Sequence, residues 1–218
     1  RESSSFEYFD ITDFINDLED GNNILALHGL NASKTSSDFL ISAELEVTTI
    51  TTYHDDKYDD DLALLDGLRI TELMYNPDGN DNVEFIEFLN ISPNTLDLTG
   101  VRFTDGIVFT FPEDTNLPAG EYLLVVKDPV AFALEYPLVP GEIIFGPYEG
   151  QLANNGEDIV LNLAEPLEAA ILRFEYNDTW YPSTDGGGSA LVISDPNAHP
   201  ATWNDAESWL AAAPTPGQ

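Results

Sequence analysis

Between residues 68 and 128 the chain repeats one pattern, in which an apolar or alternating run is followed by a cluster of Gly, Pro, Asn and Asp. Apolar runs of this length are typical of β-strands, and such clusters are typical of the turns between them. The pattern predicts strands at 68–75, 83–91, 100–111 and 121–127. Several short strands at this spacing indicate an antiparallel sandwich or barrel. We therefore expect an all-β domain.

The pattern continues toward the C-terminus, where strands are predicted at 142–146, 157–163, 169–176 and 190–194. Two short helices are predicted from their capping residues. In DPVAFALEYP, Asp128 is the expected N-cap and Pro129 the first helical residue. In NDAESWLAAAP, Asn204 is the expected N-cap and Pro214 ends the helix, with Trp209 turned toward the core.

Residues 1–50 have a different pattern, which predicts a short helical turn at 9–18 and two strands at 24–31 and 38–47. A single hairpin of this kind does not form a stable core by itself, so we expect it to join other strands or dock on the next domain. Within residues 9–46, FDITDFINDLEDGNNILALHGLN and SSDFLISAELE resemble the last strands of the galactose-binding-like jelly rolls of secreted bacterial proteins.

An aspartate-rich stretch separates this segment from the strand-rich part of the chain. Runs of like charge repel one another and usually form solvated linkers. We therefore expect three parts: a partial jelly-roll segment at 1–50, an acidic linker at 51–66 and a β-domain at 67–218.

The charge balance excludes some classes of partner. The chain has 40 acidic and 7 basic residues and a formal net charge of −33. Such a surface repels the phosphate backbone of nucleic acids and anionic membrane surfaces, so we expect neither as a partner. No run approaches the ~20 apolar residues of a membrane-spanning helix, and we expect no membrane insertion. The acidic residues are interpreted either as a solvated surface suited to salty surroundings or as ligands for calcium.

One loop, NPDGNDNVE, has oxygen-bearing side chains at alternating positions, as calcium-binding loops do. The candidate ligands are Asn76, Asp78, Asn80, Asn82 and Glu84. An EF-hand loop has glycine at its sixth position, whereas Asp81 stands there in this chain. The alternative, which we favour, is a polar loop whose side chains cap their own backbone. Calcium is the one cofactor that the sequence suggests.

The carboxylates of the predicted strands do not form a convincing catalytic pair. Glu84 and Glu87 lie three positions apart, and residues at this spacing in a strand point to opposite faces. Glu72 lies in an apolar strand, where it is either a buried, hydrogen-bonded carboxylate or, as we favour, a residue at the rim. The histidines are far apart in the sequence and none has a partner at zinc-ligand spacing. We therefore predict no catalytic residues.

Aromatic residues near the end of the strand at 169–176 are the other candidate for binding. Trp180 and Tyr181 would suit sugar rings if they form an exposed platform, and would be ordinary core residues if they are buried.

The strand-rich part resembles a bacterial lamin-tail domain over residues 68–218. Five separated motifs carry this resemblance in order: LRITELMYNPDGNDNVEFIEFLNISPNTLDLTGVRFTDG, FTFPEDTNLPAGEYLLVVKDPVAFALEYP, FGPYEGQLANNGEDIVLNL, YNDTWYPSTDGGGSALVI and PTPGQ. The resemblance implies an immunoglobulin-like antiparallel β-sandwich that binds a partner and does not catalyse a reaction. The sequence has no heptad rod and no prenylation signal, so the filament assembly of nuclear lamins is not implied.

The resemblance and the composition together lead to one functional expectation. We expect a non-catalytic accessory module of a larger exported or cell-surface bacterial protein, which binds a protein or another surface component outside the cell. A carbohydrate-binding module is one alternative, using the region of Trp180 or the N-terminal segment. A non-catalytic fragment of a secreted hydrolase is the other.

Overall fold

A computed structural model describes residues 56–167 and 169–218. The predicted hairpin and jelly-roll segment at 1–50 lies outside the described residues. No helix in the described ranges combines the length and the apolar character needed to cross a membrane.

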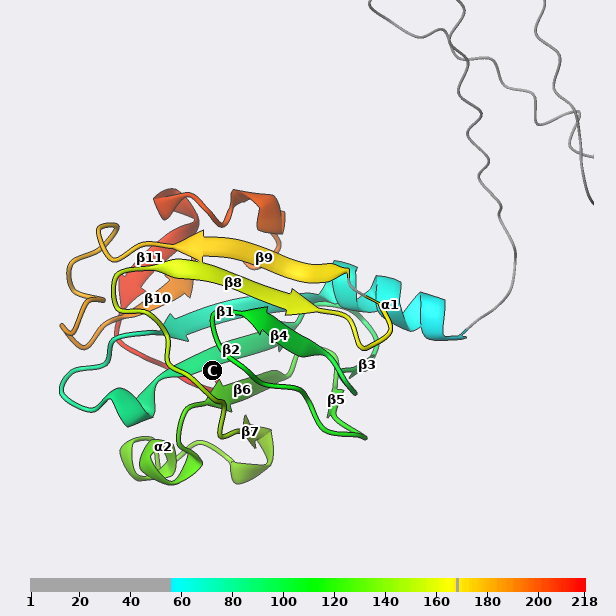
Figure 1. Cartoon of the computed structure of the whole chain (residues 1–218), viewed down its shortest axis with the longest axis horizontal. Coiled ribbons are helices and arrows are strands. Elements are labelled where there is room, and N and C mark those ends of the chain that lie inside the picture. The colour runs from blue at the N-terminus through cyan, green and yellow to red at the C-terminus, as the bar shows by residue number, and fades with distance from the viewer. Residues whose placement is uncertain (1–55, 168) are drawn as a thin grey trace, which may run out of the picture. The chain divides into compact units, whose positions relative to one another are not determined.

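The described residues are mostly β-structure (Figure 1). The helices are α1 (Asp56–Gly67) and α2 (Pro129–Glu135), with short 3-10 turns at Asp81–Val83, Gly141–Ile143, Pro200–Thr202 and Ala206–Ser208. The strands are β1 (Leu68–Met74), β2 (Phe85–Asn90), β3 (Leu96–Asp97), β4 (Arg102–Asp105), β5 (Asn116–Leu117), β6 (Tyr122–Val126), β7 (Ile144–Phe145), β8 (Glu157–Asn162), β9 (Ala170–Tyr176), β10 (Ala190–Ile193) and β11 (Trp209–Ala212).

The strands form a sandwich. A six-stranded sheet has the order β11-β10-β1-β2-β6-β7, and a three-stranded sheet has the order β4-β8-β9. Figure 1 shows β4, β8 and β9 lying over β1 and β2. Neighbouring strands are antiparallel, except that β7 runs parallel to β6. The all-β sandwich prediction is confirmed.

The main core lies between the two sheets. The six-stranded sheet contributes buried Ile70, Leu73 and Phe88, and the three-stranded sheet contributes Leu161 and Phe174. In β8 the alternate residues Ile159 and Leu161 face this core, because successive residues of a strand point to opposite faces, whereas β1 is buried on both of its faces.

Helix α2 forms where its capping residues predict it. The Asp128 carboxylate accepts hydrogen bonds from the backbone N–H groups of Val130 and Ala131, at 2.9 and 3.1 Å. Phe132 is fully buried and packs edge-on against Phe85 of β2, with ring centroids 5.5 Å apart. Helix α2 thereby covers one end of the outer face of the six-stranded sheet and encloses a second, smaller core there.

The second predicted helix, starting at Asn204, is wrong. Trp209 begins strand β11 and pairs with Ile193 of β10. It is fully buried, and its ring stacks on Phe174 with centroids 5.2 Å apart. The Asn204 side chain does not cap a helix but accepts a hydrogen bond from the backbone N–H of Glu175, at 2.8 Å. Burial of the indole and pairing with β10 outweigh the local helix propensity of the alanine-rich segment.

Two further expectations about local structure need correction. The single strand predicted at 100–111 is a hairpin: β4 turns at Gly106, whose φ is +88°, and Phe103 then donates its N–H to the carbonyl of Phe109 at 2.9 Å. Residues 56–66, expected to belong to a linker, form most of helix α1. Leu64 of this helix is buried in the main core, so the helix is anchored to the sandwich.

Candidate functional site

A bulge in β1 places two glutamates opposite each other. Leu68 and Ile70 point into the main core, and strict alternation would put Glu72 there as well. The pairing with β2 shifts between Ile70 and Glu72, so that Leu73 faces the core and Glu72 faces outward. The shifted register sets Glu72 directly against Glu87 of β2.

Both carboxylates are buried although they lie on the outer face of the sheet. Glu72 retains 1% and Glu87 retains 2% of its accessible surface. The cover is residues 213–218, which follow β11 and which we call the C-terminal strap; the side chain of Pro216 in this strap is buried. Figure 1 shows the C-terminus beside β2 and β6. The expectation that Glu72 lies at the rim is therefore wrong.

Neutral donors satisfy the two carboxylates. The backbone N–H of Thr215 lies 3.1 and 3.2 Å from the two carboxylate oxygens of Glu72. The backbone N–H of Gly217 donates to Glu87 at 2.6 Å, and the hydroxyl of Thr71 donates to the other oxygen of Glu87 at 2.6 Å. The strap is thus held by alternate residues, one on each glutamate.

Burial raises the pKa of both groups. Loss of hydration, and to a smaller extent the neighbouring charge of Glu87, raises the pKa of Glu72 to about 8. Loss of hydration raises the pKa of Glu87 to about 7, against the opposing effect of the hydrogen bonds from Thr71 and Gly217. The pair therefore retains a proton near neutral pH.

Glu84 shows a different arrangement at the start of β2. One carboxylate oxygen forms a 2.6 Å ion pair with the ammonium group of Lys127. The other accepts hydrogen bonds from the Tyr148 hydroxyl at 2.6 Å and from the backbone N–H of Leu152 at 3.0 Å. Glu84 is 2% exposed, so this is a buried ion pair with its acceptor positions occupied. Its partners differ entirely from those of Glu87, as expected for opposite faces.

The other predicted calcium ligands form their hydrogen bonds with residues other than Glu84. Asn76 donates its side-chain N–H to Asp185, and Asn80 accepts from the backbone N–H of Asn82 at 3.2 Å. This is the backbone capping that we considered as the alternative to calcium. Within residues 56–167 and 169–218, no group of three or more His, Cys, Asp or Glu side chains is arranged to hold a metal ion. The Glu84 carboxylate is engaged by Lys127, Tyr148 and Leu152, and calcium binding by the five candidate residues stays a prediction.

The two aromatic candidates are partly buried. Trp180 packs against the main core and leaves part of its surface accessible. The hydroxyl of Tyr181 donates to the backbone carbonyl groups of Ala206 and Trp209, at 3.0 and 2.8 Å. Tyr181 therefore holds the segment before β11 against the sandwich, and sugar binding by Trp180 and Tyr181 stays a prediction.

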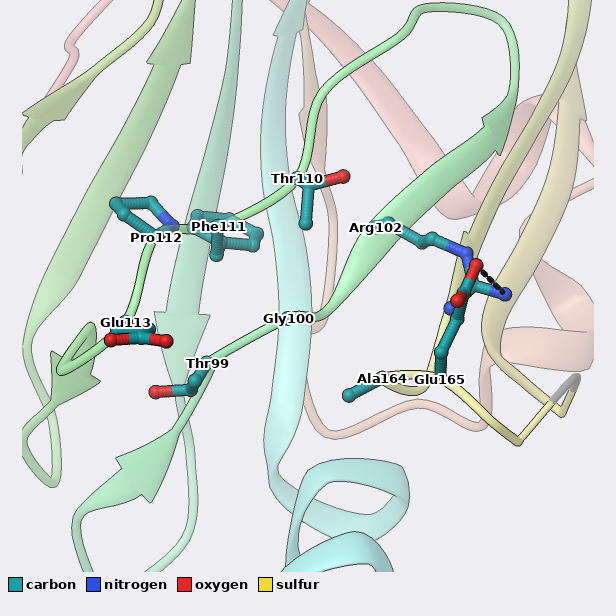
Figure 2. A pocket seen from close by; sticks show the side chains of 9 residues that line it. All are labelled: Thr99, Gly100, Arg102, Thr110, Phe111, Pro112, Glu113, Ala164 and Glu165. Carbon is teal, nitrogen blue, oxygen red and sulfur yellow. Dashed lines mark ion pairs between the residues drawn. The ribbon is translucent and has the colours of Figure 1, made fainter.

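A hollow of about 670 Å³ lies beside β4 (Figure 2). In Figure 2 the Arg102 side chain points toward Glu165 and away from Phe111. Its guanidinium lies 3.8 Å from the Glu165 carboxylate and donates to the carbonyl of Leu163 at 3.0 Å. Arg102 is therefore already engaged, and the lining residues include no nucleophile paired with a base.

The outward side of α2 carries apolar side chains that the fold does not cover. Val130 is 72% exposed, Leu134 is 80% exposed, and Leu138 just after the helix is 96% exposed. These three residues form what we call the α2 apolar surface. Sequence reasoning missed it, although PVAFALE is apolar except for Glu135, and a helix that packs on one side must expose the apolar residues of its other side.

Comparison with known proteins agrees with this architecture. A family model described as the lamin tail domain matches residues 65–198, which is more than half of the chain. Searches of curated proteins and of solved structures gave no match. The family is an immunoglobulin-like, non-catalytic interaction domain, and the observed sheets and short helices are consistent with that fold. The chain belongs to the lamin tail domain family.

Proposed function

We propose that this chain is a non-catalytic interaction module of a larger exported or cell-surface bacterial protein, and that it binds a protein partner through the α2 apolar surface. The observation that supports this proposal is the exposure of Val130, Leu134 and Leu138 along one short segment. Isolated apolar residues on a surface need no explanation, but three largely exposed aliphatic side chains spaced four residues apart favour an interaction surface.

The charge of the chain supports a protein partner with a basic rim. The net charge of −33 disfavours anionic membranes and nucleic acid as ligands for this surface. Glu135 lies beside Leu134 and is exposed. A partner with an apolar centre and surrounding Lys or Arg would match both features, since rim charges steer association and an apolar core supplies binding energy.

Site-specific photo-crosslinking tests the proposal. A photoreactive amino acid replaces Leu134 in the parent polypeptide, and Val108, which is 64% exposed on the β4 hairpin, serves as the matched control position. We expect one discrete protein adduct from position 134, none from position 108, and loss of the adduct when Val130→Ser and Leu138→Ser are added. Absence of an adduct from position 134, or equal adducts from both positions, would contradict the proposal.

A carbohydrate-binding role is the second candidate, supported by the partial exposure of Trp180. Glycan-array binding that is lost in Trp180→Ala and retained in Leu134→Ser would favour it over protein binding. Hydrolase activity of the purified chain would instead contradict a non-catalytic role.

Calcium binding by the loop at 76–82 is retained as a separate proposal. It predicts that Ca²⁺ raises the melting temperature and that a chelator lowers it. If the midpoint is unchanged by either treatment and by Asp78→Ala, the loop does not bind calcium.

A further inference from the structure

No positively charged side chain is described at the contact between the C-terminal strap and the Glu72–Glu87 pair, although buried carboxylates usually need one. The basic side chains whose positions are described are engaged elsewhere: Arg69 donates to carbonyl groups of Leu65, Asp66 and Leu68, and Arg102, Lys127 and Arg173 pair with Glu165, Glu84 and Asp158. Two adjacent carboxylates without a cation repel each other if both are ionised. Loss of the proton from this pair would therefore destabilise the contact.

We propose that the Glu72–Glu87 pair is a proton-dependent fastening for the C-terminal strap, which is held on the sheet while the pair retains a proton and is released when the pair loses it. The inference does not depend on the proposed protein partner, because it concerns a contact within this chain.

The geometry supports a local release of the strap. Pro216 of the strap is buried. The polar contacts described between the strap and the sheet are those of Thr215 with Glu72 and of Gly217 with Glu87. A hollow of about 160 Å³ borders the pair, which gives solvent a route for proton exchange. The strap follows β11 directly, so it can leave the sheet without unpairing a strand.

The groups that surround the pair would not supply a compensating charge. On β1 and β2 its neighbours are Thr71 and Leu89, and on β10 the neighbour is Val192. Tyr122 of β6 is the nearest titratable group on that strand, and burial, with the charge of Glu87, raises its pKa. Tyr136, after α2, is held neutral because burial and nearby carboxylates raise its pKa to about 12. Among the described neighbours of the pair, none carries a positive charge or titrates near neutral pH, so we assign the response there to the two glutamates.

The direction of the response follows from proton linkage. With the strap closed, the pKa values of Glu72 and Glu87 are raised to about 8 and about 7. With the strap open, water reaches both groups and their pKa values fall toward the ordinary range. Between the ordinary pKa of glutamate and these raised values, the closed state binds more protons than the open state. The equilibrium constant for opening therefore increases as pH rises, by up to about tenfold per pH unit for each proton released.

Amide hydrogen exchange of the natural chain between pH 5 and pH 8 tests the proposal. The protection factors of the Thr215 and Gly217 amides, corrected for intrinsic exchange, are expected to fall at least tenfold over this range. The Leu152 amide is the internal reference, because it also donates to a buried carboxylate but one that is paired with Lys127. Constant protection of the strap amides, or an equal fall at Leu152, would overturn the proposal without any substitution.

A charge-matched pair of variants separates titration of these glutamates from a general effect of charge. Glu72→Gln with Glu87→Gln keeps an oxygen acceptor at each position and removes both titrating groups, so the strap amides should lose their dependence on pH. Glu113→Gln with Glu121→Gln removes the same charge from exposed positions and should leave the dependence intact. The reverse pattern would also overturn the proposal.

Discussion

Glu84, just before β2, and the pair Glu72 and Glu87, on β1 and β2, are buried glutamates that are stabilised in opposite ways. Glu84 is paired with Lys127 and accepts two further hydrogen bonds, so its negative charge is balanced inside the fold. Glu72 and Glu87 receive only neutral donors, from Thr71 and the C-terminal strap. The comparison shows that burial alone does not determine what a carboxylate does. A buried carboxylate that is paired with a cation stabilises the fold as a charged group, whereas one with only neutral donors responds to pH.

Removal of the cation from Glu84 is the strongest way to break this comparison. Lys127→Met leaves Glu84 buried without its counter-charge, and we expect a loss of about 3–5 kcal/mol in the free energy of unfolding. Urea denaturation measures the loss. Arg173→Met breaks the exposed ion pair with Asp158 and should cost less than about 1 kcal/mol. Equal effects of the two substitutions would show that the Glu84 ion pair contributes no more than a surface pair.

The pH dependence of global stability is the next largest effect. The pKa values of Glu72 and Glu87 are raised in the folded chain, so their contribution to stability is complete below about pH 4.5 and is lost as pH rises toward 7 and 8. We expect the difference in unfolding free energy between the natural chain and the Glu72→Gln, Glu87→Gln variant to change by about 2 kcal/mol for each of the two groups from pH 5 to pH 7. A difference that stays constant over this range would mean that neither group titrates there.

The α2 apolar surface should give the smallest change in stability. Leu134→Ser alters an exposed side chain and is expected to shift the unfolding free energy by less than about 0.5 kcal/mol. Phe132→Ala, on the buried side of the same helix, should cost about 3–5 kcal/mol. Thermal or urea unfolding of both variants checks this contrast. A large loss from Leu134→Ser would indicate that the residue packs within the fold and is not a binding surface.

The sequence predicts those parts of the fold that depend on local chemistry. Apolar or alternating runs bounded by turn residues located β1, β2, β6, β8, β9 and β10 to within a few residues, because the side chains that face either core are apolar. The capping geometry of Asp128 located α2, since that carboxylate satisfies two backbone N–H groups that the helix itself cannot. The lamin-tail resemblance supplied the family, and the family match confirms it.

The candidate site could not be predicted because it depends on pairing between distant segments. The bulge after Ile70 decides that Glu72 faces Glu87, and nothing local to β1 marks it. The cover over this pair comes from Thr215 and Gly217, more than a hundred positions later in the chain. Trp209 was misassigned for the same reason, since its strand conformation is fixed by β10 and by Phe174 rather than by its own segment.

A carboxyl-carbon NMR titration of Glu72 and Glu87 in the natural chain tests the central claim most directly. The account predicts that the pair titrates with apparent pKa values of about 7 and about 8, because burial without a cation disfavours ionisation. Titration of both groups between about pH 4 and pH 5, the ordinary range for glutamate, would contradict it.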